Sequence, residues 1–173
     1  ELMGLTVIPV SGGNTERQIL LIQDLKPKIL TCTPSYALTI AETIRGMGIN
    51  PASLGLRAAI LGAEPWTEEM RREIEAKLPV KTVNIYGLTE VIGPGVSCEC
   101  VEAQNGMHVY EDYFYPEVID PSTGAVLPHG TRGELVFTSL TKEALPVIRY
   151  RTGDVASLDA SPCACGRTSI RMS

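Results

Sequence analysis

Short apolar runs alternate with helical patterns along the first half of the chain. The β-rich runs predict strands at residues 5–10, 28–32, 56–61 and 80–85. In the intervening stretches 14–25, 35–47 and 67–78, apolar residues recur at helical spacing. Strand–helix alternation of this kind is typical of a mostly parallel sheet with helices on its faces.

Polar residues that can cap a helix N-terminus stand at the start of each helical stretch. Asn14, Ser35 and Thr67 carry side-chain oxygens that can accept hydrogen bonds from the first backbone N–H groups. Glu68 and Glu69 follow Thr67, where the helix dipole favours negative charge. We therefore expect three helices.

The second half of the chain has a different pattern. From about Val96 onward no helical period is present, and strands are predicted at 107–115, 117–119, 133–140 and 155–158. Turn-forming sequences lie between them at 120–124 and 128–130. The predicted fold class is α/β, with a mostly parallel sheet flanked by helices (residues 1–95) followed by a small antiparallel β subdomain (residues 96–173).

Composition and charge exclude several classes of function. Among 173 residues, 44% are hydrophobic and the net charge is −5, which argues against a nucleic-acid partner. No apolar run reaches the length of a bilayer span, and no signal segment opens the chain, so we expect a cytoplasmic protein without a membrane partner. The chain begins within an apolar run and stops after a polar segment, so we expect a piece of a longer protein.

Residues 84–90, with the sequence NIYGLTE, begin at the end of the fourth predicted strand, and ligands of open α/β sheets bind where strands end. Gly87 would let a ligand approach the backbone, and the Thr89 hydroxyl could donate to a phosphate oxygen. Glu90 is a suitable Mg²⁺ ligand, and Tyr86 offers a flat ring to a base or an aryl group. The alternative is an ordinary strand end, a glycine turn and a solvated glutamate.

Three further segments accompany this one: LGAEP at 61–65, GEL at 133–135 and YRTGD at 150–154. In this order, the four segments resemble the core motifs of the adenylate-forming superfamily, which includes acyl- and aryl-CoA synthetases. The chain is most similar to the phenylacetate–CoA ligase branch, through SGGNT at 11–15, TPSYA at 33–37, GPGV at 93–96, HVYED at 108–112 and CACGRT at 163–168. The resemblance covers essentially the whole chain.

The resemblance implies an AMP-forming acid–thiol ligase that uses ATP, Mg²⁺ and coenzyme A. A carboxylate attacks the α-phosphate, pyrophosphate leaves, and the CoA thiol then displaces AMP. Thr89 would contact the α-phosphate and Glu90 would hold Mg²⁺, while Asp154 would accept from the ribose hydroxyls unless it is only a turn residue after Gly153. The other nucleotide-binding residues would be Gly62, Ala63, Glu64 and Pro65, as a wall beside the adenine, together with Tyr86 and Gly87.

The resemblance also leads us to expect an acyl pocket and to note two family segments that this sequence lacks. Small residues leave space for an aryl ring and tyrosines supply faces, which makes Tyr36, Ala37, Tyr86, Gly93 and Pro94 candidates, although Tyr36 could equally be a core residue. The family's phosphate loop and its C-terminal domain, with the lysine that assists adenylation, have no counterpart here. We therefore expect little or no catalysis by this chain alone.

Cysteines form two C-x-C pairs, with a fifth, Cys32, inside an apolar run. Thiols gathered in this way in a cytoplasmic protein favour a structural zinc ion over disulfides, and some relatives in the branch are expected to carry one. The preferred ligands are Cys100, His108, Cys163 and Cys165. Cys98 would share a strand face with Cys100 and could replace His108. Reduced free thiols and a hydrogen-bonding His108 are the alternatives.

Two other functions stay open at the level of sequence. The parent enzyme could activate a different carboxylic acid, or the chain could be a non-catalytic nucleotide-binding module. A homodimer is also left open. The expected partners are an aryl acetate, ATP and CoA.

Overall fold

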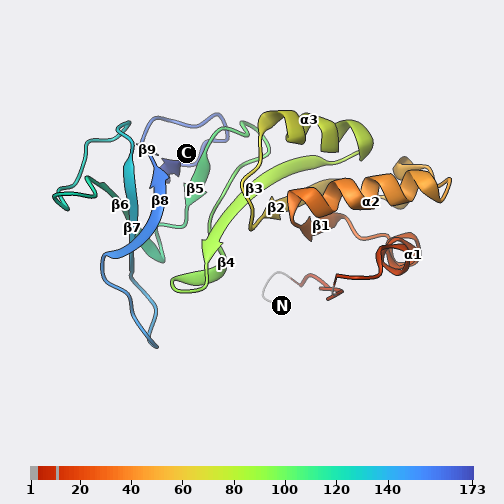
Figure 1. The fold of residues 1–173 in the computed structure, drawn as a ribbon, viewed down its shortest axis with the longest axis horizontal. Coiled ribbons are helices and arrows are strands. Elements are labelled where there is room, and N and C mark those ends of the chain that lie inside the picture. The colour runs from red at the N-terminus through yellow and green to blue at the C-terminus, as the bar shows by residue number, and fades with distance from the viewer. Residues whose placement is uncertain (1–3, 11) are drawn as a thin grey trace. The chain divides into compact units, whose positions relative to one another are not determined.

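The computed structural model describes residues 4–10 and 12–173, and its backbone falls into two compact units (Figure 1). The first unit comprises the described residues up to Ala59 together with Trp66–Lys81. The second comprises Ile60–Pro65 and Thr82–Ser173. The domain division at residue 95 stays a prediction. Ser11, part of the SGGNT segment, lies outside the described residues.

Three α-helices of the described chain lie in the first unit: α1 (Thr15–Leu25), α2 (Pro34–Gly46) and α3 (Glu68–Lys77), with a 3₁₀ turn, η1 (Pro51–Leu54), after α2. The expected caps of α1 and α3 are confirmed, since Asn14 accepts from the Arg17 N–H at 3.0 Å and Thr67 from the Met70 N–H at 3.3 Å. The expected cap of α2 is wrong. Thr33 caps it instead of Ser35, because Pro34 takes the first helical position, where its missing N–H costs nothing.

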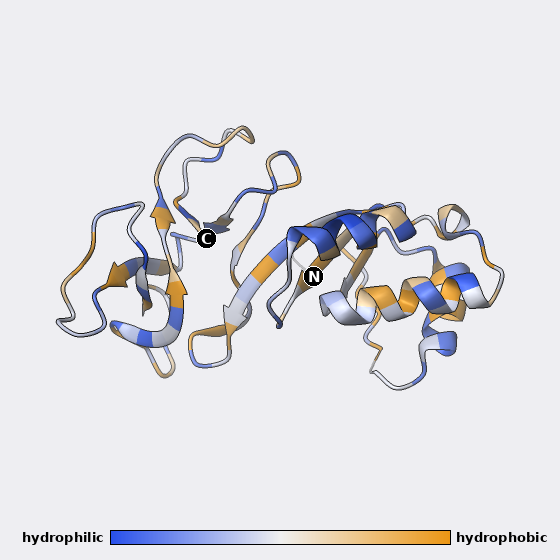
Figure 2. Cartoon of the chain, turned by 45° about the horizontal axis from the view of Figure 1, so that its top comes forward, coloured by the Kyte–Doolittle hydropathy of each residue, from blue (hydrophilic) through white to orange (hydrophobic). Residues whose placement is uncertain are grey.

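The core of the first unit lies where α2 packs against α1 and α3. Its fully buried side chains include Ile19, Ile40, Ile44 and Ile74. Figure 2 shows α3 as mainly hydrophilic, in keeping with a helix that buries only Arg71 and Ile74. The apolar stripe of α3 is therefore narrow, and its remaining surface faces solvent.

A mixed sheet runs through the chain in the order β1-β2-β3-β4-β5-β10-β9. The predicted α/β class is confirmed, although β3 continues beyond residue 85 and pairs antiparallel with β4, so that the antiparallel part is larger than expected. The strands are β1 (Ile29–Cys32), β2 (Ala58–Gly62), β3 (Lys81–Leu88), β4 (Ile92–Cys98), β5 (Met107–Val109), β9 (Leu158–Asp159) and β10 (Arg171–Met172).

The second unit also contains a three-stranded antiparallel sheet, as predicted for this half of the chain (Figure 1). It consists of β6 (Phe114–Ile119), β7 (Gly133–Ser139) and β8 (Tyr150–Ala156). Leu135, Val136 and Phe137 of the central strand are fully buried. The turn predicted at 120–124 is closed by the Asp120 carboxylate, which accepts from the Ser122 N–H at 2.8 Å.

Two strand predictions differ from the structure. Residues 5–10 form no strand, and Leu5 and Val7 are 56% and 78% exposed, because the described part of the chain offers this segment no neighbouring strand. An apolar run therefore does not form a strand unless a neighbouring strand is available for pairing. The run 107–115 is divided between β5 and β6 by a turn in which the Tyr113 N–H donates to the Tyr110 carbonyl at 2.9 Å.

Candidate functional site

The NIYGLTE segment lies on the hairpin of β3 and β4. Tyr86 pairs with Ser97 and Leu88 with Ile92, so Gly87 belongs to the strand and does not form the glycine turn of the alternative interpretation. The turn is at Thr89 and Glu90, which are both exposed. The next residue, Val91, is fully buried, and its N–H donates to the Leu88 carbonyl at 3.1 Å. Val91 thus anchors the turn, and Thr89 and Glu90 project from its tip.

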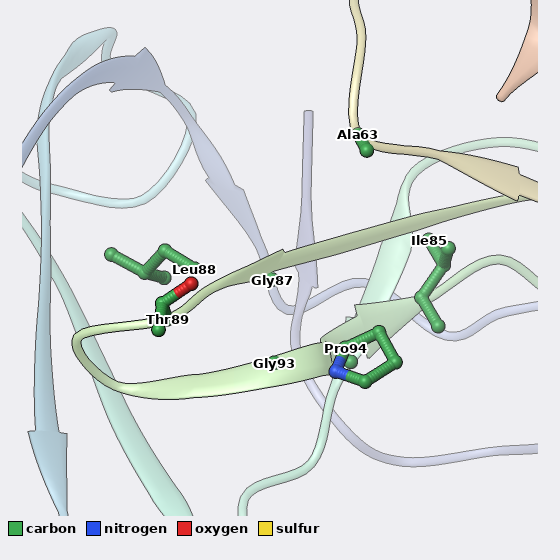
Figure 3. Close-up of a pocket in the computed structure, with 8 residues that line it drawn as sticks. Ala63, Ile85, Gly87, Leu88, Thr89, Gly93 and Pro94 are labelled. Carbon is green, nitrogen blue, oxygen red and sulfur yellow. The ribbon is translucent and has the colours of Figure 1, made fainter. Parts of the chain in front are cut away.

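An irregularity in β4 creates a pocket beside this turn. Between the pairs Tyr86–Ser97 and Leu88–Ile92, residues 93–96 lie opposite Gly87 alone. A Cβ on Gly87 would lie only 2.5 Å from the Gly95 backbone nitrogen, so the glycine is required by the adjacent strand rather than by a ligand. The pocket encloses about 200 Å³ and is lined by Ala63, Ile85, Gly87, Leu88, Thr89, Gly93, Pro94 and Gly95 (Figure 3).

The predicted adenine wall reaches this pocket only in part. Gly62 ends β2 against the Ile85 carbonyl, where a Cβ would collide, and Ala63 follows with a φ of 68° and lines the pocket. Glu64 and Pro65 come next and lie outside the lining. The structure therefore brings together Ala63, Gly87, Thr89, Gly93 and Pro94. Sequence reasoning had not selected Ile85, Leu88 and Gly95, although the Gly-Pro-Gly run was a signal for Gly95.

Asp154 of the YRTGD segment lies on a bulge in β8. Glu134 pairs with Val155 and Val136 with Arg151, so residues 152–154 lie opposite a single residue of β7. Gly153 has a φ of 78°, which favours glycine. The Thr152 hydroxyl donates to the Leu135 carbonyl at 2.9 Å and accepts from the Asp154 N–H at 3.0 Å. Bulges re-aim side chains in this way, and the Asp154 carboxylate is exposed.

Tyr86 and Asp154 meet directly, although 68 positions separate them. The Tyr86 hydroxyl donates to Asp154 Oδ2 at 2.5 Å. Burial, followed by the hydrogen bond to Asp154, raises the pKa of Tyr86 well above its usual range. Nearby, Arg149 forms an ion pair with Glu117, and Arg151 forms one with Glu134.

The two remaining acyl-pocket candidates, Tyr36 and Ala37, lie on α2 in the first unit. The Tyr36 hydroxyl is 3.0 Å from the Thr15 hydroxyl, and Ala37 is fully buried in that unit's core. Their contribution to an acyl site stays a prediction.

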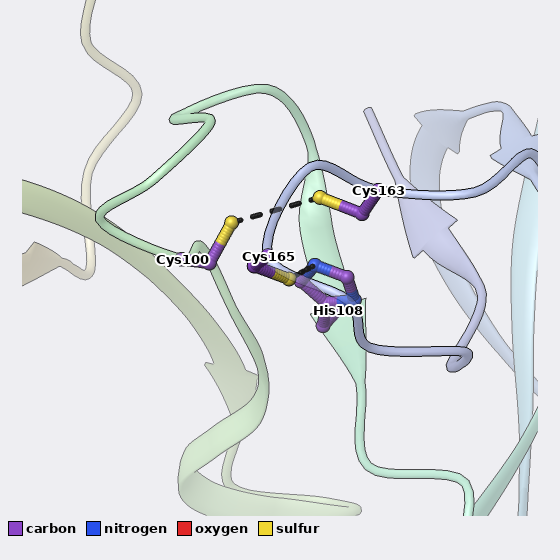
Figure 4. A group of neighbouring side chains, drawn as sticks. All are labelled: Cys100, His108, Cys163 and Cys165. Atoms are coloured by element: carbon purple, nitrogen blue, oxygen red, sulfur yellow. Dashed lines mark hydrogen bonds between the residues drawn. The ribbon is translucent and has the colours of Figure 1, made fainter.

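Four side chains of the second unit form a cluster suited to a metal ion. The ligand atoms of Cys100, His108, Cys163 and Cys165 all lie within 4.8 Å of one another (Figure 4). The Sγ atoms of Cys100 and Cys163 are 3.7 Å apart, and Cys165 Sγ is 3.4 Å from His108 Nε2. The cluster ties the segment after β4 and strand β5 to the segment between β9 and β10.

The surroundings of the cluster orient its ligands. His108 Nδ1 lies 3.2 Å from the Ser169 carbonyl and 3.1 Å from the Ser169 hydroxyl. In the tautomer that donates from Nδ1 to the carbonyl, Nε2 is free to bind a metal. The Arg167 backbone N–H lowers the pKa of Cys165, while burial raises the pKa of Cys100. No sequence signal pointed to Ser169.

Cys98 does not join the four ligands. The strand that carries it ends at Cys98 itself, so the expected alternation that would place Cys98 and Cys100 on one face does not extend to Cys100.

Comparison with known proteins places this geometry in a family. A model of the AMP-binding enzyme family matches residues 2–141. The chain belongs to this family. Among the described residues, no helix is long and apolar enough to cross a membrane.

Several of its curated relatives are phenylacetate–coenzyme A ligases. The Thermus thermophilus enzyme is 58% identical over 99% of this chain, and the Pseudomonas putida enzyme is 57% identical over 91%. The chain spans 39% and 36% of their lengths, respectively. Among solved structures, an open conformation of 2-hydroxyisobutyryl-CoA ligase in complex with 2-HIB-AMP and CoA aligns over 95% of this chain and 37% of its own, with a TM-score of 0.89 and 28% identity.

Proposed function

We propose that this chain is the adenylate-binding part of a phenylacetate–CoA ligase. The complete enzyme converts phenylacetate and ATP into phenylacetyl-adenylate and pyrophosphate, then transfers the acyl group to the CoA thiol and releases AMP. The observation that carries the proposal is the hydrogen bond between Tyr86 and Asp154. It joins the segment that the resemblance assigns to the phosphates with the segment assigned to the ribose, and both lie in one compact unit.

For adenylation, the chain supplies groups at the tip of the β3–β4 hairpin. As the substrate carboxylate attacks the α-phosphorus and the bond to pyrophosphate breaks, the Thr89 hydroxyl donates to an α-phosphate oxygen. Glu90 offers an exposed carboxylate to Mg²⁺, which supplies charge neutralisation at the phosphates. The buried Val91 supports the proposal, because it fixes the backbone that carries both groups.

Nucleotide binding uses residues on both sides of this hairpin. Asp154 accepts from the ribose hydroxyls, and the exposure of its carboxylate on the β8 bulge leaves it accessible. Gly62 and Ala63, continuing into Glu64 and Pro65, supply the backbone beside the adenine. The small residues Gly93 and Pro94 leave room for the acyl group, with Tyr36, Ala37 and Tyr86 as further candidates.

The identity of the acid is tested by ATP–pyrophosphate exchange with the complete ligase. We expect exchange with phenylacetate to exceed exchange with 2-hydroxyisobutyrate by at least about 100-fold, because a polar, branched acid without an aryl ring leaves an aryl pocket unfilled. The similarity to 2-hydroxyisobutyryl-CoA ligase makes that acid the relevant competitor. A preference for 2-hydroxyisobutyrate would replace the phenylacetate assignment. Absence of exchange with every acid, combined with intact AMP binding, would favour a non-catalytic nucleotide-binding module.

We also propose that Cys100, His108, Cys163 and Cys165 hold a structural zinc ion. Zinc–sulfur bonds of about 2.3 Å in a tetrahedron place two sulfur atoms about 3.8 Å apart. The Sγ atoms of Cys100 and Cys163 are 3.7 Å apart, which fits this sulfur–sulfur distance. His108 Nδ1 contacts Ser169, so Nε2 is the nitrogen that would bind zinc. Zinc would cross-link three segments whose neighbouring strands β5, β9 and β10 are only two or three residues long.

Elemental analysis of protein purified without chelators tests the zinc assignment. We expect about one equivalent of zinc per chain, and less than about a tenth of an equivalent would contradict it. We also propose a cytoplasmic location, where a reducing environment would keep the cysteine ligands available for zinc.

A further inference from the structure

Beyond this assignment, and resting on it, we propose that Tyr86 is a positioning residue that holds the Asp154 carboxylate in the orientation required by the ribose hydroxyls. Its hydroxyl donates to Asp154 Oδ2 at 2.5 Å. The sequence had suggested only a role for the flat ring of Tyr86 beside a base or an aryl group. The structure adds a role for its hydroxyl.

Tyr86 itself is held firmly. Its ring stacks on Phe137, with centroids 6.3 Å apart and an interplanar angle of 30°. Phe137 is fully buried and makes an edge-to-face contact with Phe114 at 6.4 Å. The Tyr86 ring therefore packs against the buried apolar cluster that contains Phe137 and Phe114, and this packing holds its hydroxyl in place. A tyrosine hydroxyl is protonated at neutral pH, and the raised pKa of Tyr86 keeps it a proton donor into the alkaline range as well.

Asp154 depends on this contact more than an ordinary strand residue would. It lies on the bulge of β8, next to Gly153 with its positive φ, and its side chain is exposed. Among the described residues, Tyr86 is the only side chain that donates to the Asp154 carboxylate. Without that bond the carboxylate would rotate freely. The ligand would then have to order the side chain on binding, and this entropic cost would lower its affinity.

One donor on Oδ2 still leaves the carboxylate able to bind a ribose. Each carboxylate oxygen has two lone-pair directions, so Oδ1 is free and Oδ2 retains one acceptor site. A ribose with two neighbouring hydroxyls can therefore bind in a bidentate manner while Tyr86 stays in place. Tyr86 orients the acceptor in advance and does not compete with the sugar.

The test is calorimetric titration of the complete ligase with AMP and with 2′,3′-dideoxy-AMP. We expect Tyr86→Phe, which keeps the ring and its packing, to weaken AMP binding about three- to tenfold and to leave dideoxy-AMP binding unchanged. Tyr115→Phe, which removes the hydroxyl of an exposed tyrosine, is the matched control and should change neither affinity. Thermal unfolding of each variant verifies that the fold is retained.

The variant Asp154→Asn shows whether a negative result concerns the positioning role of Tyr86 or the ribose site at Asp154. If Asp154 binds the ribose, this variant reduces AMP affinity toward that of dideoxy-AMP. Two results together would overturn the positioning role and leave the proposed ribose site standing. In Asp154→Asn, AMP would no longer bind more tightly than dideoxy-AMP. In Tyr86→Phe, the affinities for AMP and dideoxy-AMP would fall equally. An unchanged AMP preference in Asp154→Asn would overturn the ribose site itself.

Discussion

The ammonium group of Lys142 donates a hydrogen bond to the backbone carbonyl of Glu90, with 3.0 Å between Nζ and the oxygen. Lys142 lies in the connection between β7 and β8, so this bond ties that connection to the turn carrying Thr89 and Glu90. Sequence reasoning missed Lys142, because a single lysine in a loop has no distinguishing pattern. The contact suggests that the turn is held from outside as well as by Val91 beneath it.

Replacing Lys142 by methionine should loosen the turn without unfolding the protein. A hydrogen bond from an exposed ammonium group contributes at most about 1 kcal/mol to the free energy of unfolding. The rate of adenylation should fall severalfold, because Thr89 and Glu90 must be held in place while the α-phosphate reacts. Hydrogen–deuterium exchange of the β3–β4 peptide and ATP–pyrophosphate exchange by the complete ligase measure the two effects.

Lys81→Met provides the matched control, because it removes the same charge from a residue whose ion pair with Glu75 is long, at 3.8 Å. It should leave both the exchange of the hairpin amides and the adenylation rate as they are. Equal behaviour of the two lysine variants would show that Lys142 acts only through its charge or has no role.

Gly87→Ala should destabilise the hairpin and close part of the pocket. The added methyl group would lie 2.5 Å from the Gly95 nitrogen, so β4 must move away from β3. We expect the free energy of unfolding to fall by about 1–3 kcal/mol, as for other overpacking substitutions. Urea denaturation measures this change. Gly46→Ala on α2, where a Cβ meets no atom within 4 Å, should be neutral or slightly stabilising, and a loss as large as that of Gly87→Ala would contradict the steric argument.

The elements that could be predicted from the sequence are those fixed by local chemistry. Asn14 and Thr67 mark helix starts because a cap acts over three residues. Strand β4 was not predicted, since Gly93 and Pro94 interrupt its apolar pattern and disfavour a strand when considered alone. Its formation depends on Gly87 of the partner strand, which accommodates the irregular backbone, and no local pattern reports such pairing.

The candidate site shows the same limit. Motif order indicated that Thr89, Glu90 and Asp154 serve one nucleotide, but the bulge that turns Asp154 toward Tyr86 depends on the register of β8 against β7. The four metal-ligand candidates were identifiable from residue type, whereas the contact between His108 Nδ1 and Ser169 depends on the pairing of β5 with β10, which no local sequence pattern reports.

Cys163→Ser should remove the bound zinc and destabilise the second unit. Three remaining ligands bind zinc much more weakly, and the metal is expected to stabilise the folded state by several kcal/mol. Elemental analysis should show a loss of zinc, and thermal unfolding should show a lower midpoint. Cys98→Ser, which alters a thiol outside the cluster, should retain zinc and the unfolding midpoint, so a similar loss in this variant would show that the ligand set is wrong.

The ion pair between Arg151 and Glu134 should make stability depend on pH in the acid range. The hydrogen bond from Arg151, with its charge, lowers the pKa of Glu134 below the ordinary glutamate value. A carboxyl group whose pKa is lower in the folded state stabilises that state above the unfolded pKa, about 4.3, and loses this contribution as the pH falls through the folded pKa. Arg151→Met should therefore lower the urea midpoint at neutral pH, and the difference from the parent should shrink as both proteins are titrated below about pH 4. A difference that stayed constant over this range would mean that Arg151 stabilises β8 by packing and by its bond to the Pro121 carbonyl rather than through Glu134.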